Sequence, residues 1–426
     1  MTQEKAIQLA IAGHNIFLTG NAGTGKTYTL NNIIRELKRK GKIVAVTAST
    51  GIASTHINGS TIHSWSSIGI RDKLSEEDFW KIRNNKFSHD RINSADVLVI
   101  DEISMLHDYR FDLVNDVCKF VCGNRNKPFA GKQVIVVGDF FQLPPVNKNS
   151  NVKNYCFNAD AWKEANFKVC YLKKIYRQES DETLIDLLNS IRSNNIQPHH
   201  HEILNSLQNN NKNNDISMEL YCTNKNVDII NSVELSKIKS ETVISRMESS
   251  GLDFKVESLK KNILAADTLL LKKGARVMFL VNDFPRNVVN GTLGEIVDVS
   301  GIADGTIKMK VYRAGKVIDV VKHKWEIMEY DDRAGCDVAV ASVTQFPVKL
   351  AWALTIHKSQ GATFDYINLD LRDTFVENMG YVALSRVTTL DGLQLAGYNN
   401  VALHIDERII EKDREFLEES EKADRG

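Results

Sequence analysis

The sequence lacks several features that would place the chain in an easily recognised class. No apolar run approaches the length of a membrane-spanning helix, and the opening residues Met-Thr-Gln-Glu-Lys resemble neither a secretory signal nor an arginine-rich transit peptide. Cysteines are few, and Cys118 and Cys122 have no second pair or nearby histidines to complete a zinc site. These absences predict reduced thiols, no membrane partner and an intracellular location. The compactness of the chain adds the expectation of a bacterial or viral host cytoplasm.

An excess of charge of either sign is also missing. Lysine plus arginine equals aspartate plus glutamate at 54 each, so the formal net charge is zero. Such a chain cannot attract a polyanion through its overall field, and any nucleic-acid site must therefore be local. A length of 426 residues with 42% hydrophobic residues predicts two or three globular domains.

The most informative segment that is present has the pattern of a phosphate-binding loop. Residues 20–27 read Gly-Asn-Ala-Gly-Thr-Gly-Lys-Thr, after an apolar run and before a stretch of helical periodicity. Glycines let backbone N–H groups approach phosphates, while Lys26 supplies charge and Thr27 a hydroxyl for magnesium. The predicted nucleotide contacts are Gly20, Asn21, Ala22, Gly23, Thr24, Gly25, Lys26 and Thr27.

The first half of the chain alternates short β-rich runs with helical patterns, which predicts an α/β fold with a parallel sheet. Functional residues of such sheets lie at the carboxyl ends of the strands. A segment with aromatic and charged residues at 65–90 interrupts the alternation. The expected strands are residues 16–19, 43–47, 97–100, 134–137 and 169–172.

Two carboxylates follow the expected strand at 97–100. Asp101 is predicted to hold magnesium and Glu102 to orient the water that attacks the γ-phosphate. After the next strand, Gln142 is the candidate sensor of the γ-phosphate. Phe140 and Phe141 precede it, and either base stacking or ordinary core packing fits these two residues.

The second half has a different organisation. A helical face at 184–191 and an asparagine-rich connector at 209–214 introduce a second domain, whose expected strands lie at 219–222, 366–369 and 392–396. Short β-branched runs at 275–281, 294–299, 306–312 and 316–325 predict an inserted barrel-like β domain. The triplet His199-His200-His201 is interpreted as a solvated loop, and residues 406–426 as a charged, solvated helix.

Several motifs of the chain, in collinear order, closely resemble those of the petite-integration-frequency (PIF) family of superfamily-one DNA helicases. The resemblance implies two RecA-like P-loop NTPase domains, at 1–62 with 91–176 and at 177–255 with 346–426. It also implies a small wedge excursion at 63–90 and an inserted Src-homology-like β-barrel at 256–345. The motifs are residues 47–54, 59–64, 101–105, 138–145, 176–178, 188–192, 289–294, 356–361 and 381–386.

The resemblance also implies roles for individual residues. Gln3 is similar to the family's adenine-reading glutamine, and Gly361 belongs to the ATP-binding set. Arg177 and Arg386 resemble the two arginines that the second domain presents to the γ-phosphate. The catalytic candidates are therefore Lys26, Asp101, Glu102, Gln142, Arg177 and Arg386.

A nucleic-acid surface is expected from polar and basic residues at the ends of the predicted elements. Such groups contact phosphates and sugars without determining sequence, although turn chemistry and helix capping would explain the same residues. Phe140 is also a DNA-binding candidate, as a ring that could stack on a base. The other candidates are Thr50, His63, Thr223, Asn224, His357, Lys358 and Ser359.

The resulting hypothesis is an ATP- and Mg²⁺-dependent helicase that moves 5′-to-3′ on single-stranded DNA and at junctions with duplex. Four-stranded guanine structures are a further candidate substrate, and a monomer is expected in the absence of DNA. One alternative is a RecD-like motor subunit of a recombination complex. Another is a nucleotide-controlled switch, which is disfavoured because in 224–228 the aspartate stands one residue too late for the guanine-reading Asn-Lys-x-Asp.

Overall fold

The computed structural model forms two compact units, residues Met1–Glu179 with Ile405–Gly426 and residues Ser180–His404. Each unit is described separately. Among the described residues, no helix is both long and apolar enough to cross a membrane. The structure describes residues 1–425 except 58, 70, 146–153, 177–180, 209–216, 224–226, 282, 284–285, 287, 289, 313 and 332–335.

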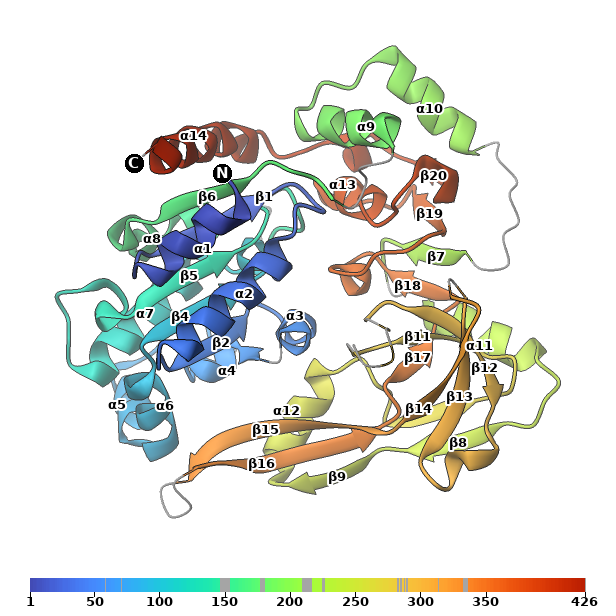
Figure 1. The fold of residues 1–426 in the computed structure, drawn as a ribbon, viewed down its shortest axis with the longest axis horizontal. Coiled ribbons are helices and arrows are strands. Elements are labelled where there is room, and N and C mark those ends of the chain that lie inside the picture. The colour runs from blue at the N-terminus through green and yellow to red at the C-terminus, as the bar shows by residue number, and fades with distance from the viewer. Residues whose placement is uncertain are drawn as a thin grey trace. The chain divides into compact units, whose positions relative to one another are not determined.

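The first unit contains a six-stranded parallel sheet of order β3-β2-β4-β5-β1-β6 (Figure 1). The five strands expected from the sequence are confirmed, with shifts of one residue at some ends, and β3 is an additional short strand. The strands are β1 Ile16–Gly20, β2 Val44–Ala48, β3 Ser60–Thr61, β4 Val97–Asp101, β5 Gln133–Val137 and β6 Lys168–Leu172.

Helices cover both faces of this sheet because its strands are apolar on both sides. Alternate strand residues such as Ile16 and Leu18 pack with buried residues of α1 Gln3–Ile11, α2 Lys26–Arg39 and α3 Gly51–His56. On α2, Leu30, Ile33 and Leu37 have the spacing of one helical face and are almost fully buried. Phe17 points to the opposite face, where α7 Asp108–Cys122 and α8 Asp160–Ala165 pack.

The carboxyl-terminal helix α14, Glu407–Arg425, belongs to the first unit. The expectation of a solvated helix in the second domain is therefore wrong. Ile409, Phe416 and Ser420 are buried, and the Ser420 hydroxyl oxygen accepts a 3.0 Å hydrogen bond from the Tyr171 amide of β6. The charged residues of α14 occupy its outer face, and this pattern concealed the narrower apolar stripe that packs on the sheet.

The excursion between β3 and β4 is helical, with α4 Ile62–Trp65, α5 Glu76–Asn84 and α6 Lys86–Ser94. Ser75 and Asp78 form a capping box that starts α5. Trp80 stacks edge-on against Phe120 of α7 with ring centroids 5.1 Å apart. Phe79 and Trp80 thus dock this segment on α7, whereas Phe87 is 50% exposed.

The second unit contains a four-stranded parallel sheet of order β18-β7-β19-β20. Its strands are β7 Met218–Tyr221, β18 Ala353–Thr355, β19 Ile367–Leu371 and β20 Leu393–Tyr398. Its helices are α9 Glu182–Arg192, α10 Pro198–Gln208, α11 Val227–Lys237 and α13 Met379–Leu384. The His199–His201 triplet lies in α10 rather than in a solvated loop, and His200 is buried.

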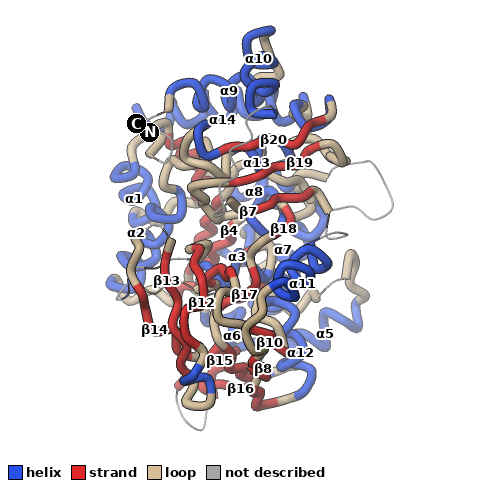
Figure 2. Tube along the Cα trace, turned by 90° about the vertical axis from the view of Figure 1, so that its right-hand side faces the viewer, coloured by secondary structure: helices blue, strands red, loops and turns tan. Residues whose placement is uncertain are grey.

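The β insert interrupts this sheet between β7 and β18 and is built from three antiparallel sheets, of orders β14-β13-β12-β11-β17, β15-β16-β9 and β10-β8. Figure 2 shows β12, β13, β14 and β17 as one group. The elements are β8 Val243–Arg246, β9 Glu248–Gly251, α12 Asp253–Asn262, β10 Thr268–Leu271, β11 Arg276–Phe279, β12 Leu293–Asp298, β13 Thr306–Val311, β14 Val317–Val321, β15 His323–Asp331, β16 Cys336–Gln345 and β17 Val348–Leu350.

Two expectations for the insert need correction. The expected boundary at residue 256 is wrong, because β8 and β9 lie before it and pair with β10 and β16. The run at 316–325 is not one strand but divides into β14 and the start of β15. A shared core that includes Val277, Ile307 and Phe346 unites the insert, while closure into a Src-homology-like barrel stays a prediction.

Short 3₁₀ segments connect many of these elements. They matter for the site because several follow directly after parallel strands. They are η1 Ile103–Met105, η2 Pro128–Gly131, η3 Cys156–Asn158, η5 Ser300–Ile302, η6 His357–Ser359, η7 Leu390–Gly392 and η8 Asn400–Leu403.

Candidate functional site

The glycine-rich loop joins β1 to the amino terminus of α2, as the sequence predicts. The Lys26 ammonium group donates hydrogen bonds to the carbonyl oxygens of Gly20 at 2.8 Å and Asn21 at 3.0 Å. The lysine therefore folds back over its own loop, at the amino terminus of α2. A lysine and a helix amino terminus together form a cradle suited to phosphate groups.

Gly25 shows why this loop requires glycine. Its φ angle is +82°, in the left-handed region, and a Cβ added there would lie 2.4 Å from Nε2 of Gln3. Gln3 donates a hydrogen bond from Nε2 to the Thr24 carbonyl oxygen at 3.2 Å. The structure thus places the Gln3 carboxamide against the phosphate loop, where the resemblance predicts an adenine contact.

Tyr176 is a residue of this site to which the sequence analysis assigned no role. Its amide donates to the Gly23 carbonyl oxygen at 2.9 Å, and its ring approaches to 4.0 Å from the Cβ position built at Gly25. Tyr176 is 48% exposed, so one side of an aromatic ring is open beside Gln3 and the loop. Its position directly before Arg177 in the 176–178 motif was the signal in the sequence.

The carboxylate pair lies at the carboxyl end of β4, next to β2. Ser49, directly after β2, holds the backbone of this pair in place. The Ser49 backbone amide donates to the Asp101 carbonyl oxygen at 3.0 Å, and the Ser49 hydroxyl donates to the Glu102 carbonyl oxygen at 2.6 Å. Glu102 has φ 51° and ψ 46°, a left-handed conformation that is rare for a residue with a side chain. Strain of this kind collects at functional sites, where the surrounding contacts hold it in place.

The electrostatics of Asp101 indicate a site that is suited to a cation. Burial raises the pKa of this carboxyl group, and the neighbouring Glu102 raises it further, while the charge of Lys26 opposes both effects. The influence of Lys26 also shows that the phosphate loop and the carboxylate pair share one site. A desolvated carboxyl group beside a second acidic side chain is relieved by a bound divalent ion.

Gln142 follows β5, the strand next to β4, and is buried at the same edge of the sheet. The backbone amide of Gln142 donates to the Asp139 carbonyl oxygen at 2.9 Å, so the segment after β5 forms a tight turn. Phe140, however, is only 4% exposed and its ring packs among those of Phe17, Phe157, Trp162 and Phe416. The prediction of a DNA contact by Phe140 is therefore wrong, and the ring belongs to the core.

Arg386 lies in the second unit, just after α13, and is 2% exposed. Its Nε donates to the Val382 carbonyl oxygen at 2.8 Å, and an Nη donates to the Ser385 hydroxyl oxygen at 2.8 Å. A longer contact of 3.4 Å to the Ala362 carbonyl oxygen connects the guanidinium group with the loop that begins at Gly361. Arg177 and Asn224 lie outside the described residues, and the assignment of both arginines to the γ-phosphate stays a prediction.

The predicted DNA contacts of the first unit have distinct environments. The Thr50 hydroxyl accepts a hydrogen bond from the Ala53 amide and caps α3. The Nε2 atom of His63 is buried without a hydrogen-bond partner among the described residues. Burial, followed by the charges of Arg110 and His107, lowers the pKa of His63 to about 4, so this ring is neutral at physiological pH.

The predicted contacts of the second unit lie where its parallel strands end. Thr223 follows β7 and is exposed, while His357 and Lys358 follow β18. Burial lowers the pKa of His357. Ser359 is fully buried and its hydroxyl donates to the Ile356 carbonyl oxygen at 2.8 Å, so it stabilises the turn, and its assignment as a DNA contact is wrong.

Lys349 is a second residue that the sequence analysis missed. It lies on β17 between Val348 and Leu350, which pack on the core of the insert, so strand alternation directs it to the other face. Burial, with a contribution from the charge of Lys358, lowers the pKa of Lys349 to about 8, and Asp228 opposes this effect. Lys349 and Lys358 thus bring two positive charges near each other. Because the chain has no net charge, a nucleic-acid site would need a local basic group of this kind.

Three possible metal ligands lie close together on α9 and α10. The Asp186 carboxylate lies 2.9 Å from His200 Nε2 and 3.5 Å from His199 Nε2. However, the Gln197 amide donates to His200 Nδ1 at 3.0 Å, so the neutral ring carries its proton on Nε2. That proton occupies the position where a metal would need a lone pair, and the group instead ties α9 to α10.

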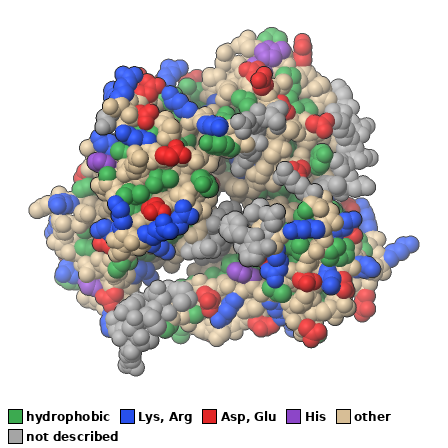
Figure 3. All heavy atoms as spheres, viewed as in Figure 1, with side chains coloured by type: hydrophobic (Ala, Val, Ile, Leu, Met, Phe, Trp, Pro, Cys, Tyr) green, Lys and Arg blue, Asp and Glu red, His purple; other side chains and the backbone are tan. Residues whose placement is uncertain are grey.

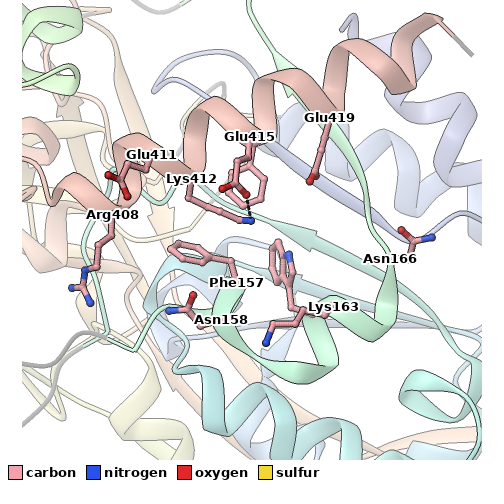
Figure 4. Close-up of a pocket in the computed structure, with 11 residues that line it drawn as sticks. Phe157, Asn158, Lys163, Asn166, Arg408, Glu411, Lys412, Glu415 and Glu419 are labelled. Atoms are coloured by element: carbon pink, nitrogen blue, oxygen red, sulfur yellow. Dashed lines mark hydrogen bonds and ion pairs between the residues drawn. The ribbon is translucent and has the colours of Figure 1, made fainter.

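One face of the molecule and one hollow of the described part of the chain can be compared with the phosphate loop. On the face drawn in Figure 3, basic and acidic side chains are interspersed and form no single stripe. A hollow of about 500 Å³ lies between α14, η3 and α8 (Figure 4). Its lining combines buried aromatic rings with the salt-bridged Lys412 and Glu415, and it contains none of the phosphate-loop residues.

The phosphate loop, the carboxylate pair and the parallel sheet define the first unit as a P-loop NTPase domain, and the second unit adds a further parallel α/β sheet. Residues 2–202 match the model of the PIF1-like helicase family. The chain is 40% identical to the "ATP-dependent DNA helicase Pif1" of Psychrobacter sp., over 95% of this chain and 69% of that protein. The chain belongs to the PIF1-like helicase family.

Solved structures agree with this membership over nearly the whole chain. The Bacteroides sp. Pif1 complex with ADP-AlF4 has a TM-score of 0.84 and 30% identity, covering 98% of this chain and 96% of that one. A Bacteroides Pif1 complex with ADP-AlF3 and single-stranded DNA has a TM-score of 0.68 and 30% identity, covering 98% and 97%. The expectation of two α/β units with parallel sheets is confirmed.

Proposed function

We propose that the chain is a motor that moves 5′-to-3′ along single-stranded DNA and separates duplex at a junction. ATP-dependent DNA helicase activity is the activity of its family, and the chain has the parts that this activity needs. The observation that carries the proposal is the placement of Lys26, Asp101 and Glu102 at one edge of a parallel sheet, with their charges interacting. The direction of movement follows from the family resemblance.

Nucleotide hydrolysis requires the phosphates to be positioned and the developing charge to be neutralised. The loop amides and Lys26 bind the phosphates, and Gln3 and Tyr176 hold the base by a carboxamide contact and ring stacking. Glu102 accepts the proton of the attacking water. Gln142 detects the γ-phosphate at the end of the neighbouring strand.

The donor set of this site fits Mg²⁺, a hard cation that prefers oxygen ligands. The Thr27 hydroxyl and the Asp101 carboxylate would hold the ion, which supplies positive charge between the phosphate oxygens. The raised pKa of Asp101 supports this assignment, because its carboxylate lies in a desolvated position beside a second acidic group.

Arg386, which the second unit carries, and Arg177, which stands near the junction of the two units in the sequence, would complete the site when ATP is bound. An arginine supplied by another domain makes hydrolysis depend on the closed arrangement of the two domains. Alternating closure and reopening would then convert each turnover into a step along the strand. The helices at residues 62–94 would act as the wedge that parts the duplex.

Directional unwinding assays test the proposal. A fluorescent duplex with a 5′ single-stranded tail should be unwound with ATP and Mg²⁺, while the same duplex with a 3′ tail should not. Unwinding from the 3′ tail alone would reverse the assigned direction. DNA-stimulated hydrolysis without unwinding in either substrate would favour the RecD-like subunit, and DNA-independent hydrolysis would favour the switch.

Two finer features belong to the same proposal. Four-stranded guanine structures are proposed as substrates, and a folded guanine-rich strand behind a 5′ tail should then be resolved in an ATP-dependent manner. A monomer is proposed in the absence of DNA, and sedimentation velocity over a range of concentrations should give one species of about 48.0 kDa. A concentration-dependent shift to a dimer would contradict the second feature.

A further inference from the structure

The hollow between α14, η3 and α8 is a surface feature to which the proposed function gives no role. Its volume of about 500 Å³ lies in the range of pockets that hold ligands, and all of its lining residues belong to the first unit. Figure 4 shows side chains of α14 on one side of it and those of η3 and α8 on the other. The buried rings of Phe157, Trp162 and Phe416 line it, so part of its wall is fixed by the core.

The charges that line the hollow do not balance. Its basic side chains are already paired with carboxylates, namely Lys163 with Asp160, Arg408 with Asp406 and Lys412 with Glu415. Glu411 and Glu419 also line it, and neither has an ion-pair partner among the described residues. Two negative charges are thus left over, and a cationic ligand is the complementary one.

Lys412 shows how a cation is held at this hollow. Its ammonium group lies 5.3 Å from the centroid of the Phe416 ring and is paired with the Glu415 carboxylate. An aromatic face next to a carboxylate suits ammonium and guanidinium groups. Glu411 and Glu419 stand one helical turn before and after Glu415, so they extend the same environment in both directions.

Trp162 adds a hydrogen-bond donor to this environment. It is 8% exposed and lines the hollow, and its indole N–H donates to no acceptor among the described residues. An indole N–H in such a position normally has an acceptor. A ligand that fits the hollow therefore brings a hydrogen-bond acceptor as well as positive charge.

The spacing of the two glutamates fits an extended peptide. Glu411 and Glu419 are eight residues apart on α14, which places their Cα atoms about 12 Å apart. In an extended chain, residues i and i+4 lie on one face about 13 Å apart, with residue i+2 between them on the same face. Peptide carbonyl oxygens supply the acceptor that Trp162 lacks, whereas a polyamine supplies only positive charge.

We propose that this hollow is the docking site for an extended basic segment of a partner protein, with Arg or Lys at positions i and i+4 and an apolar residue at i+2. Glu411 and Glu419 pair with the two cations, the aromatic rings contact the apolar side chain, and Trp162 donates to a peptide carbonyl oxygen. The hollow contains none of the phosphate-loop residues, so docking does not compete with ATP. The inference is independent of the proposed movement on DNA.

The test uses the peptide acetyl-Gly-Arg-Gly-Leu-Gly-Arg-Gly-amide with an uncharged fluorophore, and binding to the full chain is measured by anisotropy. Replacing both glutamates, Glu411→Gln with Glu419→Gln, should weaken binding by about 2- to 30-fold, the effect of two exposed ion pairs. Added salt should weaken binding to the wild-type protein in the same way. The matched control is Glu418→Gln, which removes an exposed carboxylate of α14 that does not line the hollow and should leave binding unchanged.

Two competing ligands separate a peptide site from simple attraction of cations. The rearranged peptide acetyl-Gly-Gly-Arg-Arg-Leu-Gly-Gly-amide has the same charge without the spacing and should bind more weakly. Spermidine at a matched concentration of positive charge should fail to displace the first peptide. Trp162→Phe keeps an aromatic ring without the N–H donor and should also weaken binding of the first peptide.

Other results would overturn the inference. Equal binding by the wild-type protein and the double glutamate variant would remove the two carboxylates from the site. Equal affinity for the two peptides, or displacement by spermidine, would show attraction of cations without a peptide site. Self-association that the double variant abolishes would make a second copy of this chain the occupant. Hydrolysis and unwinding should be unchanged in the double variant, so a failure of the motor proposal would be seen separately.

Discussion

Ser49 holds the catalytic candidate Glu102 in a left-handed backbone conformation. The Ser49 hydroxyl donates to the Glu102 carbonyl oxygen at 2.6 Å, from the end of the neighbouring strand β2. The adjacent amide of Ser49 binds the Asp101 carbonyl oxygen at 3.0 Å. The turn after β4 is therefore fixed from its side, so the direction of the Glu102 side chain is set before any nucleotide binds.

Changing Glu102 to Gln should leave ATP binding nearly intact and lower DNA-stimulated hydrolysis by several orders of magnitude. The amide keeps the size of the side chain but cannot accept the proton of the attacking water. Nucleotide affinity by fluorescence titration and turnover by phosphate release measure the two effects. Lys26→Ala is the contrasting variant and should impair both, while unchanged turnover in Glu102→Gln would exclude Glu102 from the mechanism.

Gly25→Ala should weaken nucleotide binding with little effect on the fold. The added methyl group would lie 2.4 Å from Gln3 Nε2, at a backbone position with φ +82°. The loop must therefore shift or displace Gln3, and the phosphate cradle loses its shape. Nucleotide affinity and melting temperature are compared with those of Gly41→Ala, a left-handed glycine with open space around it. Normal ATP affinity in Gly25→Ala would contradict the assigned loop geometry.

Arg386→Ala should lower turnover more than ATP affinity, because a γ-phosphate arginine acts mainly on charge that develops in the transition state. Arg386 is buried and hydrogen-bonded, so the variant also leaves polar carbonyl groups without partners. Arg386→Lys keeps the charge and serves as the control for folding. Equal losses of affinity and turnover in a folded variant would indicate a ground-state contact instead.

Phe416→Ala should destabilise the first unit by about 3–5 kcal/mol, the usual cost of removing a buried phenyl ring. Phe416 is 3% exposed and stacks edge-on against Phe17 of β1 with ring centroids 4.9 Å apart. Urea denaturation measures the free energy of unfolding. Phe254→Ala removes the same group from α12, where Phe254 is 69% exposed, and should cost much less. A small effect at Phe416 would contradict the packing of α14 on this sheet.

The affinity for single-stranded DNA should fall as the pH rises through about 8. The pKa of Lys349 is lowered to about 8 in the free protein, chiefly by burial, so its amine loses its charge there. Lys349→Arg should remove this pH dependence, since arginine remains charged. Lys349→Met should bind more weakly at pH 7 with a smaller salt dependence. Lys237→Met, an exposed lysine on α11, is the control and should behave as wild type.

The prediction from the sequence was most successful for motifs whose residue types and spacing fit few other roles. The loop at residues 20–27 and the pair Asp101-Glu102 were located because glycine, lysine and carboxylates at that spacing have few other uses. The prediction was wrong for Phe140 and Ser359, since an aromatic ring or a hydroxyl fits a binding surface and an interior equally well. Only burial distinguishes these alternatives, and burial is a property of the packed chain.

The sequence by itself determined the order of the elements, the phosphate cradle and the family, because these depend on local patterns and on spacing along the chain. Tertiary structure decided that α14 packs on the first sheet, that β8 and β9 belong to the insert, and that Trp162 and Glu411 line one hollow. These relationships join residues far apart in the chain. They depend on which apolar faces bury one another, and that choice is made only when the whole chain has packed.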